Sequence, residues 1–364
     1  MFVSTRPRPP ARAVSLCGKI EVLKKTKNRK IFRGLLLIGF ALILFSAFYL
    51  VVQPLSQKNS VSSYFGSFSF SKEVSVLNFG DVMFDRGVRN IIYNRDRDPF
   101  EYVKRDISVL KKYDFVIANL EGPIIEIDRK LCQQKAYNFQ FASNTPERLK
   151  SVGINIVNIA NNHNYDCYKR GFESTKRYLD EAGVAHMGDV EIDKSYLIKE
   201  IKGKKIAFVG IDALTSPIPV LKFYPLVKKL KSENDYVVVN IHWGEEYNLG
   251  FTKNQREIAH KLIDNGVDVI FGHHPHVIEP VEIYKNSVIF YSLGNFVFDQ
   301  DFGDTTFGIG AGVKFSDTKK VFEIYPYNMR KFAPEFMKAD EKEKFCERVL
   351  ESILHTGCQF EIKV

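Results

Sequence analysis

The sequence predicts an α/β protein in which a folded domain follows a single transmembrane helix. Short β-branched runs alternate with amphipathic stretches from residue 73 onward, which is the pattern of repeated βαβ units. An uncharged, strongly apolar segment occupies residues 34–52. With 364 residues and 45% hydrophobic content, the chain has enough apolar side chains for a large buried core. We therefore expect a basic tail (1–33), a transmembrane segment (34–52), a linker (53–72) and a folded domain (73–364).

The basic tail carries the whole excess of positive charge. Residues 1–33 contain ten Lys and Arg residues and one acid, Glu21, whereas the chain contains 52 basic and 43 acidic residues. Without the tail, 42 residues of each sign remain. A neutral body without a recognised base-reading module predicts that nucleic acid is not a partner.

Residues 34–52 have the length and composition of a membrane-spanning helix. Nineteen uncharged residues, at about 1.5 Å per residue, cross the hydrocarbon layer of a bilayer. The basic tail before them places the N-terminus in the cytoplasm and the domain in the extracellular or periplasmic space, as a single-pass protein of the cell membrane. A cleaved signal peptide is the alternative. The segment is longer than a usual signal core, however, and Val51-Val52-Gln53-Pro54 offers no small-residue cleavage pattern.

Residues 53–72 are rich in Ser and lack a clear period, which is typical of a linker. Four cysteines follow the predicted membrane segment, and an oxidising compartment would allow two disulfides with three pairings. Proximity favours Cys346 with Cys358, which would leave Cys132 with Cys167. Four free buried thiols are the alternative.

The domain alternates strands and helices in its first half. We expect strands at 74–79, 114–120 and 155–160, and helices at about 100–112, 146–152 and 171–182. A Lys-Gly turn inside residues 196–214 predicts an antiparallel hairpin. Alternation resumes with a helix at 225–231, a strand at 235–243, a helix at 253–265 and a strand at 267–274. The end is richer in strands and closes with a helix at about 340–355.

Polar side chains of metal-binding types follow five of these strands. The carboxyl ends of strands in an open α/β sheet form the edge where sites are built. Carboxylate and amide oxygens together with imidazole nitrogens suit Mn²⁺, Fe²⁺ or Zn²⁺. Six or seven ligands exceed the needs of one tetrahedral Zn²⁺, so they predict two divalent metal ions bridged by a carboxylate. The residues are Asp81, Glu121, Asn162, His163, His242, His274 and His276.

Each residue also has a simpler explanation when it is considered alone. Asp81 fits a turn at a strand end, Glu121 a solvated loop, and His242 a packed core histidine. The histidine cluster is harder to explain in this way. The spacing of His274 and His276 predicts that both rings lie on one side of an extended segment.

Six segments occur in an order that resembles a known family. They are GDVMFDRG (80–87), NLEGP (119–123), ANNHNYD (160–166), HWGEEY (242–247), GHHPHVIEP (272–280) and FYSLGNFVFDQ (290–300). Together they resemble the successive motifs of the CapA family of poly-γ-glutamate capsule-synthesis proteins, which is similar to the calcineurin-like metallophosphoesterases. The resemblance covers about residues 74–300 and implies a four-layer α/β/β/α sandwich of the metallo-dependent phosphatase type.

The resemblance also implies roles for individual residues. Glu121 would bridge the two ions, and His163, oriented by Asp166, would act as proton donor or electrostatic partner for the leaving oxygen. Arg86 would meet an anionic substrate group, and the region of Asn295 would line the pocket. The implied metal ligands are Asp81, Glu121, Asn162, His242, His274 and His276.

The implied function is synthesis or export of a capsule or other extracellular polymer of the poly-γ-glutamate type, with a two-metal hydrolase site of the phosphoesterase type. The expected partners are the membrane, an anionic polymer or phosphoester substrate, and a membrane synthesis or export complex. The alternative is a non-catalytic subunit that binds or transports polymer and retains the metallophosphatase fold.

Overall fold

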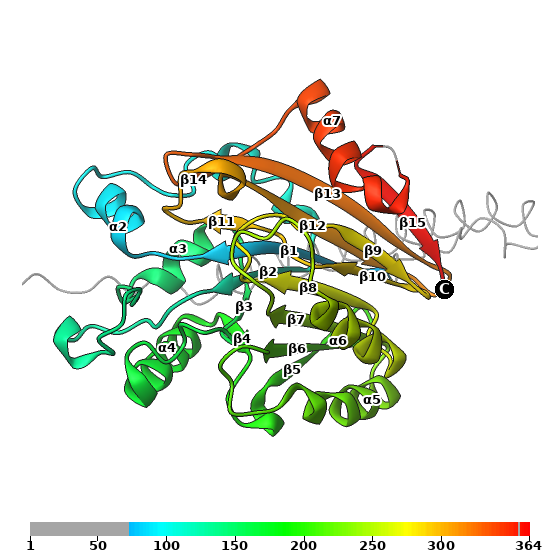
Figure 1. The fold of residues 1–364 in the computed structure, drawn as a ribbon, viewed down its shortest axis with the longest axis horizontal. Coiled ribbons are helices and arrows are strands. Elements are labelled where there is room, and N and C mark those ends of the chain that lie inside the picture. Colours follow the sequence, from blue (N-terminus) through cyan, green and yellow to red (C-terminus); the bar gives the residue numbers. More distant parts are fainter. Residues whose placement is uncertain (1–72, 356) are drawn as a thin grey trace, which may run out of the picture. The chain divides into compact units, whose positions relative to one another are not determined.

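A computed structural model of the chain describes residues 73–355 and 357–364 (Figure 1). The predicted tail, transmembrane segment and linker lie outside the described residues. Within the described ranges, no helix combines the length and the apolar character needed to cross a membrane.

The first of two β-sheets has nine strands, and its main path runs β14-β13-β12-β1-β2-β3-β4. Strands β1 to β4 are parallel, whereas β12, β13 and β14 form an antiparallel extension. β11 pairs with β1, and β15 pairs with β13. The strands are β1 (Val74–Val82), β2 (Phe115–Leu120), β3 (Ile156–Asn158), β4 (Ala185–Met187), β11 (Asn295–Val297), β12 (Phe307–Phe315), β13 (Lys319–Arg330), β14 (Ala333–Phe336) and β15 (Gln359–Lys363).

The second sheet has six strands in the order β5-β6-β7-β8-β10-β9. Its four central strands are parallel, and each edge strand pairs antiparallel with its neighbour. The hairpin predicted around the Lys-Gly turn is confirmed, because β5 and β6 meet at Lys202 and Gly203, with φ of 54° and 73°. The strands are β5 (Tyr196–Ile201), β6 (Lys204–Asp212), β7 (Tyr236–His242), β8 (Val269–His273), β9 (Val281–Tyr284) and β10 (Ser287–Phe290).

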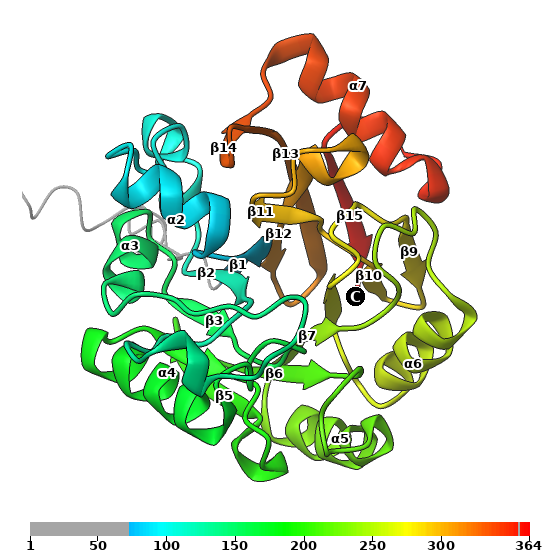
Figure 2. The same cartoon turned by 60° about the vertical axis from the view of Figure 1, so that its left-hand side comes forward.

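Three hydrophobic clusters order the sheets and helices into layers. The middle cluster joins the two sheets, with Val76 and Ile117 from the first and Val238 from the second. One outer cluster contains α3 and α4 against the first sheet, and the other contains α5 and α6 against the second (Figures 1 and 2). The predicted mixed α/β fold is therefore confirmed. The helices are α2 (Arg86–Tyr93), α3 (Thr145–Ser151), α4 (Tyr168–Ala182), α5 (Phe223–Glu233), α6 (Lys253–Asp264) and α7 (Ala339–Val349).

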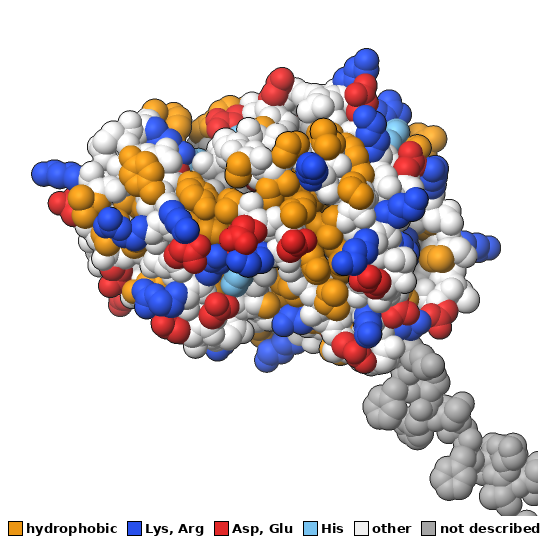
Figure 3. All heavy atoms as spheres, turned by 90° about the horizontal axis from the view of Figure 1, so that it is seen from below, with side chains coloured by type: hydrophobic (Ala, Val, Ile, Leu, Met, Phe, Trp, Pro, Cys, Tyr) orange, Lys and Arg blue, Asp and Glu red, His pale blue; other side chains and the backbone are white. Residues whose placement is uncertain are grey.

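The surface of the domain mixes charges of both signs. On the face seen in Figure 3, Lys and Arg side chains lie among Asp and Glu side chains, and neither sign forms a continuous area. The mixture of charges on this face agrees with the equal numbers of basic and acidic residues that follow the basic tail.

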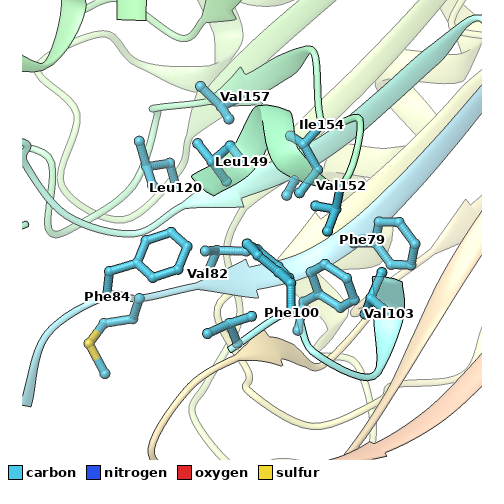
Figure 4. Packing of buried hydrophobic residues seen from close by; sticks show 14 of the residues in the cluster. Phe79, Val82, Phe84, Phe100, Val103, Leu120, Leu149, Val152, Ile154 and Val157 are labelled. Atoms are coloured by element: carbon cyan, nitrogen blue, oxygen red, sulfur yellow. The ribbon is translucent and has the colours of Figure 1, made fainter. Parts of the chain in front are cut away.

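Aromatic packing holds the strand ends of the first sheet in place. Figure 4 shows Phe79, Phe84 and Phe100 gathered beside β1, near Leu149 of α3. The rings of Phe84 and Phe100 meet edge to face at 5.9 Å between centroids, and Phe79 stacks on Phe296 at 4.1 Å. Burying such side chains contributes roughly 25 cal/mol per Å² of apolar surface. The carboxyl end of β1 therefore rests on a well-packed layer.

Two glycines allow strand ends to approach neighbouring backbone closely. A Cβ atom at Gly80 would lie 1.7 Å from the carbonyl oxygen of Gly294, and one at Gly272 would lie 1.9 Å from that of Tyr291. Only glycine fits these positions without displacing the facing chain. Gly80 directly precedes Asp81, and Gly272 lies two residues before His274, so both glycines position candidate site residues.

Two local predictions differ from the structure, and some of its elements were not predicted. The helix expected at 100–112 is wrong: the segment forms two short 3₁₀ helices, Val103–Asp106 and Leu110–Lys112. The spacing of the buried side chains Phe100, Val103 and Leu110 fits an α-helix as well, so the sequence pattern did not separate the two. The closing helix α7 ends at Val349, well before residue 355. The helix α2, capped by the Asp85 side chain, and the strand β15 were not predicted.

The cysteine pairing favoured by proximity is confirmed, and the alternative of four free thiols is wrong. Disulfides join Cys132 to Cys167 and Cys346 to Cys358. The first ties the long loop after β2 to the residue before α4, and the second ties α7 to the segment before β15.

Candidate metal centre

Two buried carboxylates meet at the ends of β1 and β2. Asp81 and Glu121 are both 0% exposed. Nδ2 of Asn119 donates to Oδ1 of Asp81 at 2.8 Å and to Oε2 of Glu121 at 3.4 Å, so one amide group holds both side chains. Burial, followed by the charge of Asp81, raises the pKa of Glu121 well above its usual value. Two carboxylates buried side by side need a cation to be stable in the charged form.

His242 brings the second sheet to these carboxylates. It ends β7 and is fully buried, and burial lowers its pKa well below the usual value. Ligand atoms of Asp81, Glu121 and His242 all lie within 4.8 Å of one another. Nε2 of His242 lies 3.0 Å from Oδ1 of Asn162, so the structure also brings the predicted amide ligand to this group.

His274 and His276 follow β8 in a tight turn. Their φ angles are 99° and 59°, so the expectation of an extended segment is wrong. Between the two histidines, the Pro275 carbonyl accepts a hydrogen bond from the Tyr247 N–H at 2.8 Å, which holds the turn against the loop after β7. The backbone N–H of His274 nevertheless donates to Oδ2 of Asp81 at 3.3 Å, and Nδ1 of the His276 ring lies 3.2 Å from the same oxygen. The His274 ring lies 4.8 Å from the His242 ring between centroids.

The carboxylates control the protonation of His276. Burial lowers its pKa, but the charge of Glu121 and the hydrogen bond to Asp81 act in the opposite direction and raise the pKa to about 9. Nε2 of His276 lies 3.7 Å from Oε1 of Glu121. For His274, burial lowers the pKa to about 4, which leaves this imidazole neutral and able to donate a lone pair.

The predicted pair of His163 and Asp166 forms in the structure. Nδ1 of His163 lies 2.8 Å from Oδ2 of Asp166, and the Phe139 N–H donates to the same oxygen at 2.7 Å. Nζ of Lys135 lies 2.5 Å from the other carboxylate oxygen of Asp166. Nε2 of His163 is thereby directed toward Glu121 and lies 4.0 Å from its Oε1. Burial lowers the pKa of His163, and the hydrogen bond to Asp166 opposes this shift.

Arg86 and Asn295 make contacts that the sequence did not indicate. The guanidinium of Arg86 forms an ion pair with Asp299 and lies over the ring of Phe139 at 5.0 Å and that of Phe298 at 5.7 Å. Arg86 is thus already paired with an acid. Asn295 is buried at the start of β11, and its Oδ1 lies 3.0 Å from Nδ1 of His276, so it orients a candidate metal ligand. The residues that follow it, Phe298 to Gln300, line the pocket.

A pocket of about 340 Å³ opens beside these groups. Its lining brings His163 and His276 together with Arg86 and with Glu246, which had no predicted role. Glu246 forms a second group of candidate ligands with His274 and His276, all within 4.8 Å of one another. The motif HWGEEY contained Glu246, but two adjacent acids give no basis for choosing one without the turn geometry. The remaining lining residues are Tyr137, Phe139, Tyr247, Phe298, Asp299, Gln300 and Phe302.

The donor set fits divalent metal ions. Oε1 of Glu121 and Nδ1 of His274 are buried and have no hydrogen-bond partner among the described residues. An unsatisfied buried acceptor is costly, and a cation would satisfy both atoms. Carboxylate, amide and imidazole ligands together favour Mn²⁺, Fe²⁺ or Zn²⁺ over Mg²⁺ or Ca²⁺.

Two sheets lie between helices, and candidate metal ligands gather at the carboxyl ends of strands from both sheets. Residues 75–300, more than half of the chain, match the model of the bacterial capsule synthesis protein family PGA_cap. The chain belongs to this family.

Two relatives from Bacillus agree with this membership. The chain is 31% identical over 288 residues to the "Capsule biosynthesis protein CapA" of Bacillus anthracis, covering 72% of this chain and 69% of the relative. It is 31% identical over 295 residues to the "PGA biosynthesis protein CapA" of Bacillus subtilis (strain 168), covering 75% and 76%. A solved structure, a putative 5′-nucleotidase from Staphylococcus aureus, is 13% identical with a TM-score of 0.44 over 77% of this chain and 58% of that one.

Proposed function

We propose that the chain is a membrane-anchored, metal-dependent hydrolase of the phosphoesterase type that serves synthesis or export of a capsule or other extracellular polymer of the poly-γ-glutamate type. The observation that carries the proposal is the meeting of two candidate ligand groups with His163, whose Nε2 lies 4.0 Å from Oε1 of Glu121. Family membership supports the capsule-related role.

Asp81, Glu121, His242, His274 and His276, with Asn162, would hold the ions. Two bound divalent ions would supply Lewis-acid activation of water and of a phosphoryl group. Asp166 holds Nδ1 of His163, which leaves Nε2 free to donate a proton to the leaving oxygen as the P–O bond breaks. The Phe139 ring, 4.1 Å from the His163 ring between centroids, keeps the imidazole in that orientation and limits water beside it.

The place of action belongs to the same proposal. The uncharged residues 34–52 behind a basic tail would anchor the chain, with the domain extracellular or periplasmic. Disulfides at Cys132–Cys167 and Cys346–Cys358 support an oxidising compartment. The proposed partners are the membrane, a phosphoester or anionic polymer substrate, and a membrane-bound synthesis or export complex.

The test is turnover by the full chain in detergent after loading with Mn²⁺. We expect cleavage of a generic phosphomonoester or phosphodiester, and His163→Ala should lower the rate at least about 100-fold, the usual contribution of general acid–base catalysis. His186→Ala is the control, because that ring pairs with Asp180 and belongs to neither candidate ligand group. A loaded chain that cleaves no ester and no polyglutamate would contradict the proposal.

Exposed aromatic rings around the pocket favour one alternative, a non-catalytic subunit that binds or transports polymer. Tyr137, Tyr247 and Phe302 are 61%, 44% and 54% exposed. Such rings can contact a polymer chain without a metal ion. Under this alternative, the chain treated with a chelator would bind poly-γ-glutamate as tightly as the Mn²⁺-loaded chain, and Tyr247→Ala with Phe302→Ala would weaken binding in both states.

A further inference from the structure

We propose that Glu246 is a metal ligand that completes a site with His274 and His276. This inference rests on the proposed metal-dependent function and adds a ligand to it. Ligand atoms of the three residues lie within 4.8 Å of one another, which is close enough for one ion to contact all of them. Asp81, Glu121 and His242 form a separate group with the same spacing.

The loop that carries Glu246 is fixed on both sides of this residue. Before it, Gly244 adopts φ of 85° and packs against Gln255, whose side-chain amide would lie 2.7 Å from an added Cβ. Gln255 belongs to the capping box that begins α6, so it is itself held in place. After it, the Tyr247 N–H donates to the carbonyl of Pro275 at 2.8 Å. The hydrogen bond ties the loop to the residue between the two histidines.

Backbone conformations in the two joined turns are unusual. Tyr247, His274 and His276 have φ of 64°, 99° and 59°, a region that side chains with a Cβ rarely occupy. Residues in such conformations persist where the surrounding structure requires them, and they cluster at functional sites. Here the two turns share a hydrogen bond and aim Glu246 and the imidazoles at one place.

The surroundings of Glu246 favour a cation that comes from outside the chain. Within the part of the chain that the structure describes, no Lys or Arg forms an ion pair with Glu246. It is also the exposed member of its group, whereas Asp81, Glu121 and His242 are all fully buried. Glu246 lines the 340 Å³ pocket as well. The ion that it binds would therefore face the pocket and exchange faster than the buried one.

The experiment compares Glu246→Gln with Glu245→Gln in the full chain in detergent. Glutamine keeps the size of the side chain and removes its charge, and Glu245 is an exposed neighbour that belongs to neither ligand group. Mn²⁺ binding is followed by calorimetry and by elemental analysis after gel filtration. We expect two ions in the unchanged protein and in Glu245→Gln. In Glu246→Gln, we expect one retained ion and a second that binds at least about tenfold more weakly.

Two results would overturn the inference, and they can be told apart. If Glu246→Gln binds both ions as the unchanged protein does, Glu246 is not a ligand while the metal centre stands. If the unchanged protein takes up no ion, the proposed function fails together with the inference. Thermal unfolding of each metal-free variant checks that it is folded. A second variant without the charge, Glu246→Ser, should also lose one ion, which would show that the loss does not come from the glutamine side chain disturbing the loop.

Discussion

At the residue scale, burial decides the protonation state of Glu279, which lies three residues after His276 and is 1% exposed. Burial raises its pKa to about 8, against a hydrogen bond from Nε2 of Gln255 at 2.7 Å. Its other oxygen has no hydrogen-bond partner among the described residues. The folded protein therefore keeps this carboxyl group protonated at neutral pH, whereas the unfolded chain ionises it.

We predict that Glu279→Gln makes the free energy of unfolding less dependent on pH. Below pH 4.5 both states of the chain hold the proton, and between pH 4.5 and about 8 only the folded state retains it. The native protein therefore loses stability as pH rises across that window, and the loss is complete above about pH 8. One pKa unit is worth about 1.4 kcal/mol, which limits this loss to about 5 kcal/mol. The stability of the variant relative to the native protein should therefore rise from pH 5 to pH 9.

Urea unfolding at pH 5, 7 and 9 measures the difference. Glu233→Gln, at an exposed position in α5, is the matched control and should give no such pH dependence. A stability difference between Glu279→Gln and the native protein that stays constant with pH would contradict the prediction.

Much of the candidate site followed from residue types at strand ends. Asp81 and Glu121 could be predicted because parallel strands bring their carboxyl ends to one edge of a sheet, and His242 because it ends a strand in the same way in the second sheet. Asn119, whose side chain holds both carboxylates, and Glu246 could not, because their roles depend on side-chain direction and on turn conformation. The pairing of Arg86 with Asp299 joins residues 213 positions apart, which no local pattern reports.

At the element scale, the end of β1 depends on close backbone contact with the loop before β11. We predict that Gly80→Ala destabilises the fold by about 1–3 kcal/mol, the usual cost of overpacking, because its Cβ would lie 1.7 Å from the Gly294 carbonyl. The shift should also move Asp81 and weaken metal binding. Urea unfolding and Mn²⁺ titration measure both effects.

Gly250→Ala serves as the comparison for this substitution. The nearest atom to an added Cβ there is 4.0 Å away, on Asn248. It should leave stability and metal binding close to those of the native protein. Equal effects of the two substitutions would show that the contact at Gly80 is not what constrains β1.

The disulfide Cys132–Cys167 links two elements that border the pocket. Between its cysteines lie Tyr137 and Phe139, which line the pocket, and Cys167 directly follows Asp166. With a sequence separation of 35 between the cysteines, loss of this disulfide should cost about 4 kcal/mol. We predict that the double Ser variant is both less stable and slower in phosphoester turnover. Differential scanning calorimetry and a rate assay test the two effects.

The second disulfide separates stability from activity. Cys346–Cys358 spans 12 residues, and its removal should cost about 3 kcal/mol. Its cysteines line no part of the 340 Å³ pocket, so its double Ser variant should keep the native rate at temperatures where it remains folded. A rate loss as large as that of the first variant would point to a general effect of instability.

Helices and strands were predicted where apolar residues recur in a clear local pattern, and they were missed where contacts between distant segments determine the structure. The β-branched run at 235–243 predicted β7, and the amphipathic stretch at 253–265 predicted α6. The capping box that begins α6 at Thr252 was not predicted. The strand β15 forms by pairing with β13, with Phe360 beside Phe322, and such pairing has no local signal. The helix α2 is short, and its start depends on the Asp85 cap.

At the scale of the whole molecule, repeated strand and helix segments were enough to predict an α/β fold. They did not divide the strands between two sheets, because the division depends on crossovers such as β10 pairing parallel with β8. The cluster between the sheets joins residues from opposite ends of the domain, among them Val76 and Phe360. The metal centre needs both sheets, since β1 and β2 supply carboxylates and β7 and β8 lead to histidines.

The proposed topology makes a prediction about all five cysteines of the chain. If residues 34–52 cross the membrane with the domain outside, Cys17 lies in the reducing cytoplasm and stays a thiol. The four cysteines of the domain are joined as Cys132–Cys167 and Cys346–Cys358. Alkylation with a maleimide reagent in denaturant, immediately after lysis, should therefore modify one cysteine without prior reduction and five after it. Modification of all five cysteines without reduction would place the domain in the cytoplasm. If the Cys17→Ser variant shows no modification before reduction, the free thiol of the unchanged protein is Cys17.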